Sequence, residues 1–167
     1  MIEKRITVIG CGMVGRLIAT DLGKDFLVTA VDKSEENLEL LTNFRGKKQI
    51  ADALNKADLI GITEKADLVL LAVPGFMGFK VLQSLLELGK NVVDISFFPE
   101  DANLLNETAK KNNCFAMVDC GIAPGFSHLA PGYYATKGLQ DYTCYVGGLP
   151  FEKTPPFTYK APFSPVD

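Results

Sequence analysis

Three glycines near the start of the chain have a spacing suited to binding phosphate. They occur in the run Gly10-Cys11-Gly12-Met13-Val14-Gly15, directly after an apolar segment. In a strand–turn–helix unit the first glycine permits a tight turn, the second lets the backbone approach a pyrophosphate, and the third lets the helix pack against the strand. The helix N-terminus adds unpaired N–H groups and a partial positive charge. We therefore predict that these six residues bind a dinucleotide.

A carboxylate follows the second apolar segment. Asp32 comes directly after residues 26–31, at an offset of about 20 residues from the glycine motif. There it can accept hydrogen bonds from both hydroxyls of the adenosine ribose, and it would repel the additional phosphate of NADP. We expect NAD as the cofactor, with NADP as the alternative because Lys33 comes next. A glycine-rich turn in another kind of α/β protein is the competing interpretation.

Further candidates stand where later apolar segments end. Val73, Pro74 and Gly75 close the unbroken apolar run at residues 68–73, and Ser96 closes the next one. Ligands bind at the carboxyl ends of the strands in an open α/β sheet. We therefore predict that these four residues contact the nicotinamide half of the cofactor. The competing interpretation is an ordinary turn at the end of a strand.

Two side chains are candidates for catalytic proton transfer. Asp119 ends the segment at residues 115–119, where a carboxylate can bind a substrate ammonium group or transfer a proton. His128 is the only histidine, the side-chain type that most readily exchanges protons near neutral pH. The competing roles are helix capping for Asp119 and a position at a helix start, without chemistry, for His128.

Composition argues against several other functions. The 167 residues carry a formal net charge of -3, no long basic cluster and no apolar run of transmembrane length. We expect neither nucleic acid nor membrane as a partner, no signal peptide and a cytoplasmic location. The cysteines show no C-x-x-C pair and no zinc-like spacing, so we expect structural thiols and no metal site. These cysteines are Cys11, Cys114, Cys120 and Cys144.

Strand-like and helix-like segments alternate along most of the chain. The predicted strands lie at residues 4–9, 26–31, 49–53, 68–73, 91–96 and 115–119. The predicted helices follow the glycine motif and lie at residues 35–44, 54–62, 77–88 and 101–112. This alternation predicts an α/β protein with a Rossmann-type, doubly wound parallel sheet.

The pattern changes near residue 121. A turn at residues 121–128 leads into a short helix that we expect to end near Gly132 or Gly138. Residues 141–147 alternate like a strand exposed on one face. The last stretch, residues 148–167, is rich in proline and aromatic side chains, too apolar for a disordered tail. It is predicted to open a second structural unit.

Several of these motifs together resemble the saccharopine dehydrogenase family. Besides the glycine motif they are VPGFMG at residues 73–78, VDISFFPE at 93–100, DCGIAPGFS at 119–127, YVGGLP at 145–150 and the proline pair Pro155-Pro156. The Ala-Pro-Gly and Tyr-Val-Gly-Gly-x-Pro motifs are more specific than the nucleotide fingerprint. The resemblance spans essentially the whole chain and is strongest to the lysine 6-dehydrogenase-like branch.

The resemblance implies an NAD(P)-dependent oxidoreductase that acts on the C–N bond of an amino acid or amine. It implies a nucleotide-binding domain at residues 1–121 and, at 122–167, the start of an α+β substrate and dimerisation domain. We therefore expect a truncated form of a protein that is a homo-oligomer when full length. His128 stands where asparagine is more common in the family.

The alternative is a binding module without catalysis. Nucleotide-sensing Rossmann domains of the potassium-channel regulator type begin with the same strand, glycine motif and acidic residue. Such a sensor has no need of the Ala-Pro-Gly motif at residues 123–125 or of the aromatic stretch that follows. These later segments favour the enzyme.

Overall fold

The computed structural model describes residues 4–147 and divides the chain into two compact units. The units are Met1–Asp119 and Cys120–Asp167. The predictions for residues 148–167 fall outside the described residues. The assignment of the first unit to the cofactor and of the second to the substrate stays a prediction.

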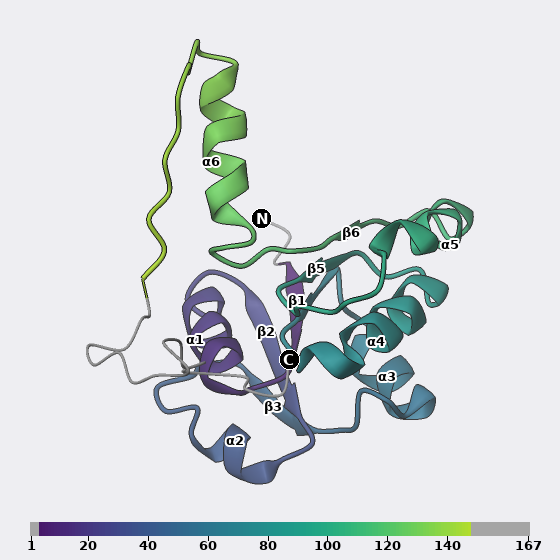
Figure 1. Ribbon diagram of the computed structural model, residues 1–167. Coiled ribbons are helices and arrows are strands. Elements are labelled where there is room, and N and C mark those ends of the chain that lie inside the picture. The colour runs from purple at the N-terminus through teal and green to yellow at the C-terminus, as the bar shows by residue number, and fades with distance from the viewer. Residues whose placement is uncertain (1–3, 148–167) are drawn as a thin grey trace, which may run out of the picture. The chain divides into compact units, whose positions relative to one another are not determined.

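The first unit is built around a six-stranded parallel sheet (Figure 1). Its strands are β1 (Arg5–Ile9), β2 (Leu27–Asp32), β3 (Lys47–Ile50), β4 (Leu68–Leu71), β5 (Val92–Asp94) and β6 (Ala116–Met117). Their order is β3-β2-β1-β4-β5-β6, and every neighbouring pair is parallel. The strand order reverses between β1 and β4, as in a Rossmann fold. The predicted fold class is confirmed.

Helices connect the strands and begin at residues suited to that position. They are α1 (Met13–Leu22), α2 (Glu35–Glu39), α3 (Lys56–Thr63), α4 (Gly75–Glu87) and, after the short 3-10 helix η1 (Ala102–Leu105), α5 (Asn106–Lys111). The Ser34 hydroxyl accepts a hydrogen bond from the Asn37 N–H at the start of α2. The Asn55 side chain accepts from the first amides of α3 in the same way. Both satisfy amides that a helix leaves unpaired.

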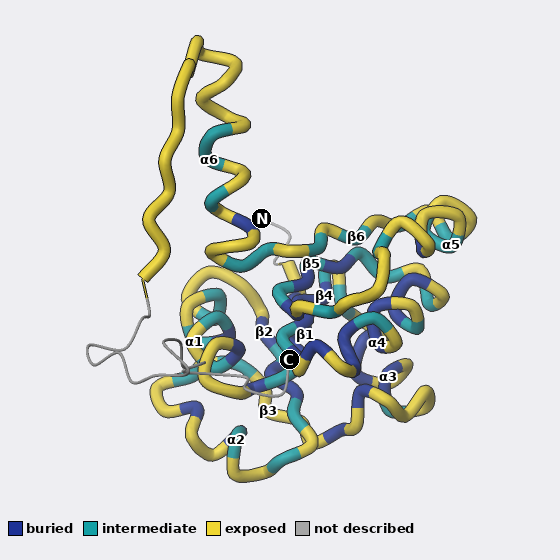
Figure 2. Tube along the Cα trace, viewed as in Figure 1, coloured by how far each residue is buried: buried dark blue, intermediate teal, exposed yellow. Residues whose placement is uncertain are grey.

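Two clusters of buried apolar side chains cover the two faces of the sheet. Ile9 belongs to the cluster that includes Leu71 and Leu82, whereas Val8 belongs to the one that includes Val28 and Ala19 from α1. Neighbouring residues of β1 thus enter opposite clusters, because side chains alternate along a strand. Figure 2 shows the buried residues gathered along the central strands and the inward side of α4. This packing explains why β1 and β4 read as nearly continuous apolar runs.

Several element boundaries differ from the prediction. The helix predicted for residues 35–44 ends at Glu39, and Asn43 adopts a left-handed conformation (φ 58°) in the turn that follows toward β3. The third strand begins at Lys47, two residues early, because it pairs in register with residues 29–32 of β2. The helix predicted for residues 101–112 is divided into η1 and α5.

The second unit is described from residue 120 to residue 147. It contains the helix α6 (Phe126–Ala135), which ends between the two predicted positions. The strand predicted for residues 141–147 is wrong. These residues are exposed and pair with no strand in the described part of the chain, and alternation forms a strand only where a partner completes the ladder.

Across residues 4–147, no helix has both the length and the apolar character needed to cross a bilayer.

We predict that Gly15→Ala destabilises the first unit. A Cβ at Gly15 would collide with the carbonyl oxygen of Gly10, and that backbone is fixed by the turn. We expect a loss of about 2–3 kcal/mol in the free energy of unfolding, measured by urea denaturation. Gly61→Ala is the matched control, because a Cβ at Gly61 on α3 would lie in open space. It should instead stabilise the protein by about 0.5–1 kcal/mol. Equal effects of the two variants would contradict this explanation.

Candidate functional site

The glycine motif forms the turn between β1 and α1. Gly10 has a φ of 95°, and a side chain there would collide with the carbonyl oxygen of Ala72 beyond β4. Gly12 precedes α1 and has open space where its Cβ would lie. The first amides of a helix have no partner within the helix. The open side of Gly12 therefore offers an anion both space and N–H donors.

Asp32 lies at the end of β2 and contacts the same turn. Its Oδ2 accepts a hydrogen bond from the Cys11 backbone N–H at 2.7 Å and one from the Asn37 side chain at 3.3 Å. Its Oδ1 accepts from the Ser34 N–H at 2.8 Å. These contacts fix the carboxylate and tie β2 to the glycine turn. Asp32 thus has a structural role that the sequence pattern does not reveal.

The remaining residues of the motif differ in their surroundings. Cys11 is buried, and its thiol contacts the Val31 carbonyl oxygen at 3.5 Å. Burial, reinforced by the charge of Asp32, raises the pKa of this thiol to about 12. Cys11 is therefore a neutral packing residue at physiological pH, and its amide is already bonded to Asp32. Met13 and Val14 are exposed on the first turn of α1.

A small cleft joins the glycine turn to the ends of the neighbouring strands. Its volume is about 60 Å³. Five of the predicted cofactor residues line it: Gly10, Asp32, Lys33, Val73 and Pro74. The cleft lies where the strand order reverses, which is where dinucleotides bind in doubly wound folds. Residues 51–53, which follow β3, also line it. Sequence reasoning missed them, although their place at the end of a predicted strand was an available signal.

The end of β5 carries a buried carboxylate. Asp94 is 0% exposed, and its Oδ1 accepts hydrogen bonds from the Ser96 N–H at 2.7 Å and the Ser96 Oγ–H at 2.5 Å. Its Oδ2 is buried and has no hydrogen-bond partner among the described residues. Burial raises the pKa of Asp94 to about 6, against the lowering effect of the Ser96 hydrogen bonds. The charge of Asp119 raises this pKa further.

The two predicted catalytic residues belong to different units and are described separately. Asp119 is exposed at the end of the first unit, with a left-handed φ of 56°. His128 is exposed on the first turn of α6, where its Nδ1 accepts from the Gly125 N–H at 3.5 Å. The Ser127 hydroxyl lies 3.2 Å from the same nitrogen. His128 thus occupies the helix-start position that competes with a catalytic role.

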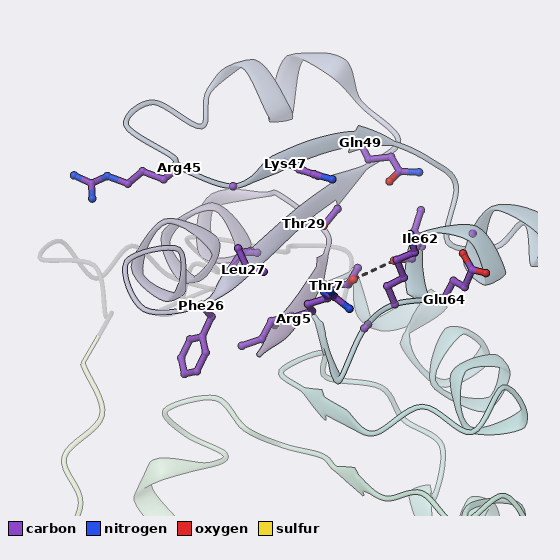
Figure 3. A pocket seen from close by; sticks show the side chains of 16 residues that line it. Arg5, Thr7, Phe26, Leu27, Thr29, Arg45, Lys47, Gln49, Ile62 and Glu64 are labelled. Atoms are coloured by element: carbon purple, nitrogen blue, oxygen red, sulfur yellow. Dashed lines mark hydrogen bonds between the residues drawn. The ribbon is translucent and has the colours of Figure 1, made fainter. Parts of the chain in front are cut away.

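A second hollow lies at the other end of the strands, away from the glycine turn (Figure 3). It has a volume of about 470 Å³ and is lined by Arg5, Leu27 and Lys47, which begin β1, β2 and β3. Figure 3 also shows the Thr7 hydroxyl, which donates to the Ile62 carbonyl oxygen at 3.0 Å. Ligands of this fold bind at the carboxyl edge of the sheet. The larger hollow is therefore not the candidate cofactor site.

We predict that Asp94→Asn changes the pH dependence of stability. The folded pKa of about 6 lies above the ordinary value of 3.8, so the folded protein binds this proton more tightly than the unfolded chain. The resulting stabilisation is complete below the unfolded pKa of 3.8 and is lost as the pH rises through the folded pKa of about 6. Relative to the asparagine variant, the wild type should lose about 3 kcal/mol between these limits. Urea denaturation across this pH range measures the difference.

The exposed carboxylate variant Asp25→Asn is the matched control and should follow the wild type at each pH. A constant difference between wild type and Asp94→Asn from acid to neutral pH would contradict the assignment of this proton to Asp94.

Comparison with known proteins places the first unit among dehydrogenase domains. The sequence model described as the saccharopine dehydrogenase NADP binding domain matches residues 6–117. The alpha-aminoadipic semialdehyde synthase of Arabidopsis thaliana is 26% identical over 122 residues, which cover 68% of this chain and 12% of that protein.

Solved structures show the same fold. Apo saccharopine dehydrogenase (L-Glu forming) from Saccharomyces cerevisiae has a TM-score of 0.69 and 21% identity, over 80% of this chain and 31% of the yeast chain. The WlbA dehydrogenase from Bordetella pertussis, solved with NADH and UDP-GlcNAcA, has a TM-score of 0.60 and 15% identity, over 81% of this chain and 40% of that one. This chain thus spans less than half the length of each of these relatives. It belongs to the saccharopine dehydrogenase NADP-binding-domain family.

Proposed function

We propose that this chain binds a nicotinamide dinucleotide and forms the cofactor part of an oxidoreductase that acts on the C–N bond of an amino acid. The substrate class is that of the lysine 6-dehydrogenases and saccharopine dehydrogenases. The observation that carries the proposal is the contact between Asp32 and the glycine turn, beside a cleft at the strand-order reversal. Family membership and the later sequence motifs support it.

The residues at the carboxyl edge can be assigned to the parts of such a cofactor. The open side of Gly12 and the start of α1 suit the pyrophosphate. Asp32 suits the adenosine ribose. Residues 73–75 and Ser96 follow β4 and β5, on the nicotinamide side of the strand-order reversal. The bound cofactor supplies hydride transfer, and the protein supplies orientation and proton transfer.

Amine oxidation also requires a group that accepts a proton. Removing a hydride from a C–H bond and a proton from the attached nitrogen converts an amine to an imine. Asp119 is an exposed carboxylate at the edge of the sheet where the nicotinamide would lie, and it is our first choice for this role. His128 is the second, because histidine is the side-chain type that most readily exchanges protons near neutral pH.

Charge favours NAD over NADP at this site, although the matching family is named for NADP. Asp32 forms no ion pair with any residue that the structure describes. Its negative charge therefore stays available to repel an additional ribose phosphate. Lys33 is exposed beside it and is the residue through which NADP would be accommodated if the preference were reversed.

We predict that the chain binds NADH more tightly than NADPH, by about tenfold or more. Asp32→Asn should weaken NADH binding and reduce this preference, because it removes the charge and one of the ribose hydrogen bonds. Fluorescence titration with both nucleotides measures the affinities. Asp21→Asn, on the exposed side of α1, is the matched control and should leave both unchanged. Tighter binding of NADPH would overturn the assignment of Asp32 and favour Lys33.

We predict that the protein reduces NAD in the presence of lysine or saccharopine, and that Asp119→Asn lowers kcat by about a hundredfold or more. His128→Asn, which places the residue common in the family, should retain most of the activity. A spectrophotometric assay of NADH formation with a panel of amino acids and polyamines tests both variants. Nucleotide binding without turnover of any of these compounds would contradict the enzyme and favour a sensor.

A further inference from the structure

The hydroxyl group of Ser96 can donate only one hydrogen bond, and its acceptor is Asp94. The Ser96 Oγ–H donates to Asp94 Oδ1 at 2.5 Å, and the Ser96 N–H donates to the same oxygen at 2.7 Å. Once that proton is committed, the Ser96 oxygen has only lone pairs to offer to another group. Ser96 is therefore held as a hydrogen-bond acceptor.

We propose that Asp94 is a positioning residue that presents the Ser96 oxygen as an acceptor for the carboxamide NH₂ group of the nicotinamide ring. This inference rests on the proposed function, because it requires a nicotinamide dinucleotide in the cleft. It assigns a role to Asp94, which neither the glycine fingerprint nor the cleft includes, and it specifies the direction of the hydrogen bond at Ser96.

The place of Ser96 in the fold supports this role. Ser96 follows β5, the neighbour of β4 on the side away from β1. A Cβ built on Gly78 would lie 2.9 Å from Ser96 Cβ and 3.3 Å from Ser96 Oγ, so the serine packs against the first turns of α4. That helix begins at Gly75, directly after the cleft residues Val73 and Pro74. The hydroxyl thus lies one strand beyond the cleft, along the path from adenosine to nicotinamide.

Burial decides which member of the pair a ligand can reach. Both residues are buried, with Asp94 0% exposed and Ser96 5% exposed, so within the pair only the serine has surface that a ligand can contact. A carboxylate that accepts the hydrogen bond of the Ser96 hydroxyl group also polarises the Ser96 oxygen and makes it a stronger hydrogen-bond acceptor. The nicotinamide carboxamide carries one donor group and one acceptor group. An acceptor fixed at Ser96 selects the NH₂ group, and this choice sets the orientation of the carboxamide.

Three ligands distinguish a hydrogen bond between Ser96 and the carboxamide from binding of the rest of the dinucleotide. NADH carries the carboxamide, its acetylpyridine analogue has a methyl group in place of the NH₂ donor, and ADP-ribose lacks the ring. The wild-type chain should bind NADH roughly three- to tenfold more tightly than the analogue, the value of one hydrogen bond. Ser96→Ala should abolish this preference and leave ADP-ribose affinity unchanged. Ser84→Ala on α4, whose hydroxyl donates to the Lys80 carbonyl oxygen, is the matched control.

Two substitutions at Asp94 test the positioning step. Asp94→Asn keeps an oxygen that accepts from Ser96 and should retain the preference for NADH. Asp94→Leu has the same number of side-chain heavy atoms, buries no charge and offers no acceptor, so it frees the serine hydroxyl and should lose the preference. Binding of ADP-ribose shows that each variant is folded.

The outcomes that contradict the inference are distinct from those that contradict the proposed function. If the wild type binds neither ADP-ribose nor NADH, the proposed function fails and the inference fails with it. If ADP-ribose binds and NADH and its analogue bind equally, only the inference fails. A loss in Ser96→Ala that is equal for NADH and its analogue would assign Ser96 a packing role and overturn the inference.

Discussion

The turn between β1 and α1 lies so close to the end of β4 that no side chain fits between them. A Cβ at Gly10 would collide with the Ala72 carbonyl oxygen, and one at Gly15 would collide with Gly10 itself. This contact holds the glycine turn against the end of β4, beside the crevice at the point where the strand order reverses. Asp32 then fixes the turn from the other side through the Cys11 amide.

Three carboxylates near the carboxyl edge of the first unit differ in their surroundings and therefore in their possible roles. Asp32 has both oxygens occupied by amide donors and lies beside the cleft. Asp94 is fully buried and has one oxygen without a partner among the described residues. Asp119 is exposed. One type of side chain thus serves as an anchor, a buried acceptor and a solvent-facing base candidate, and the difference lies in burial and hydrogen bonding rather than in sequence.

Sequence patterns predicted most strands and helices of the first unit, because these elements depend on interactions between residues close together in the sequence. The glycine motif, the apolar strands and the Ser34 cap all depend on residues a few positions apart. The errors occurred where distant partners decide the outcome. Residues 141–147 alternate like a strand, yet they have no partner in the described part of the chain. The start of β3 is set by its register with β2. The hydrogen bonds of Asp32, the lining of the cleft at residues 51–53 and the hollow at the far end of the strands likewise join segments that are separate in sequence.

The composition of β3 bears on how the molecules behave at high concentration. This strand lies at one border of the sheet, and all four of its residues are exposed in the described structure. An open border of this kind is a template onto which another chain can add a strand, and such addition starts aggregation. Two adjacent lysines, Lys47 and Lys48, occupy this border. A second copy that approached it through its own β3 would bring four positive charges together, so the lysines protect the sheet from joining to another.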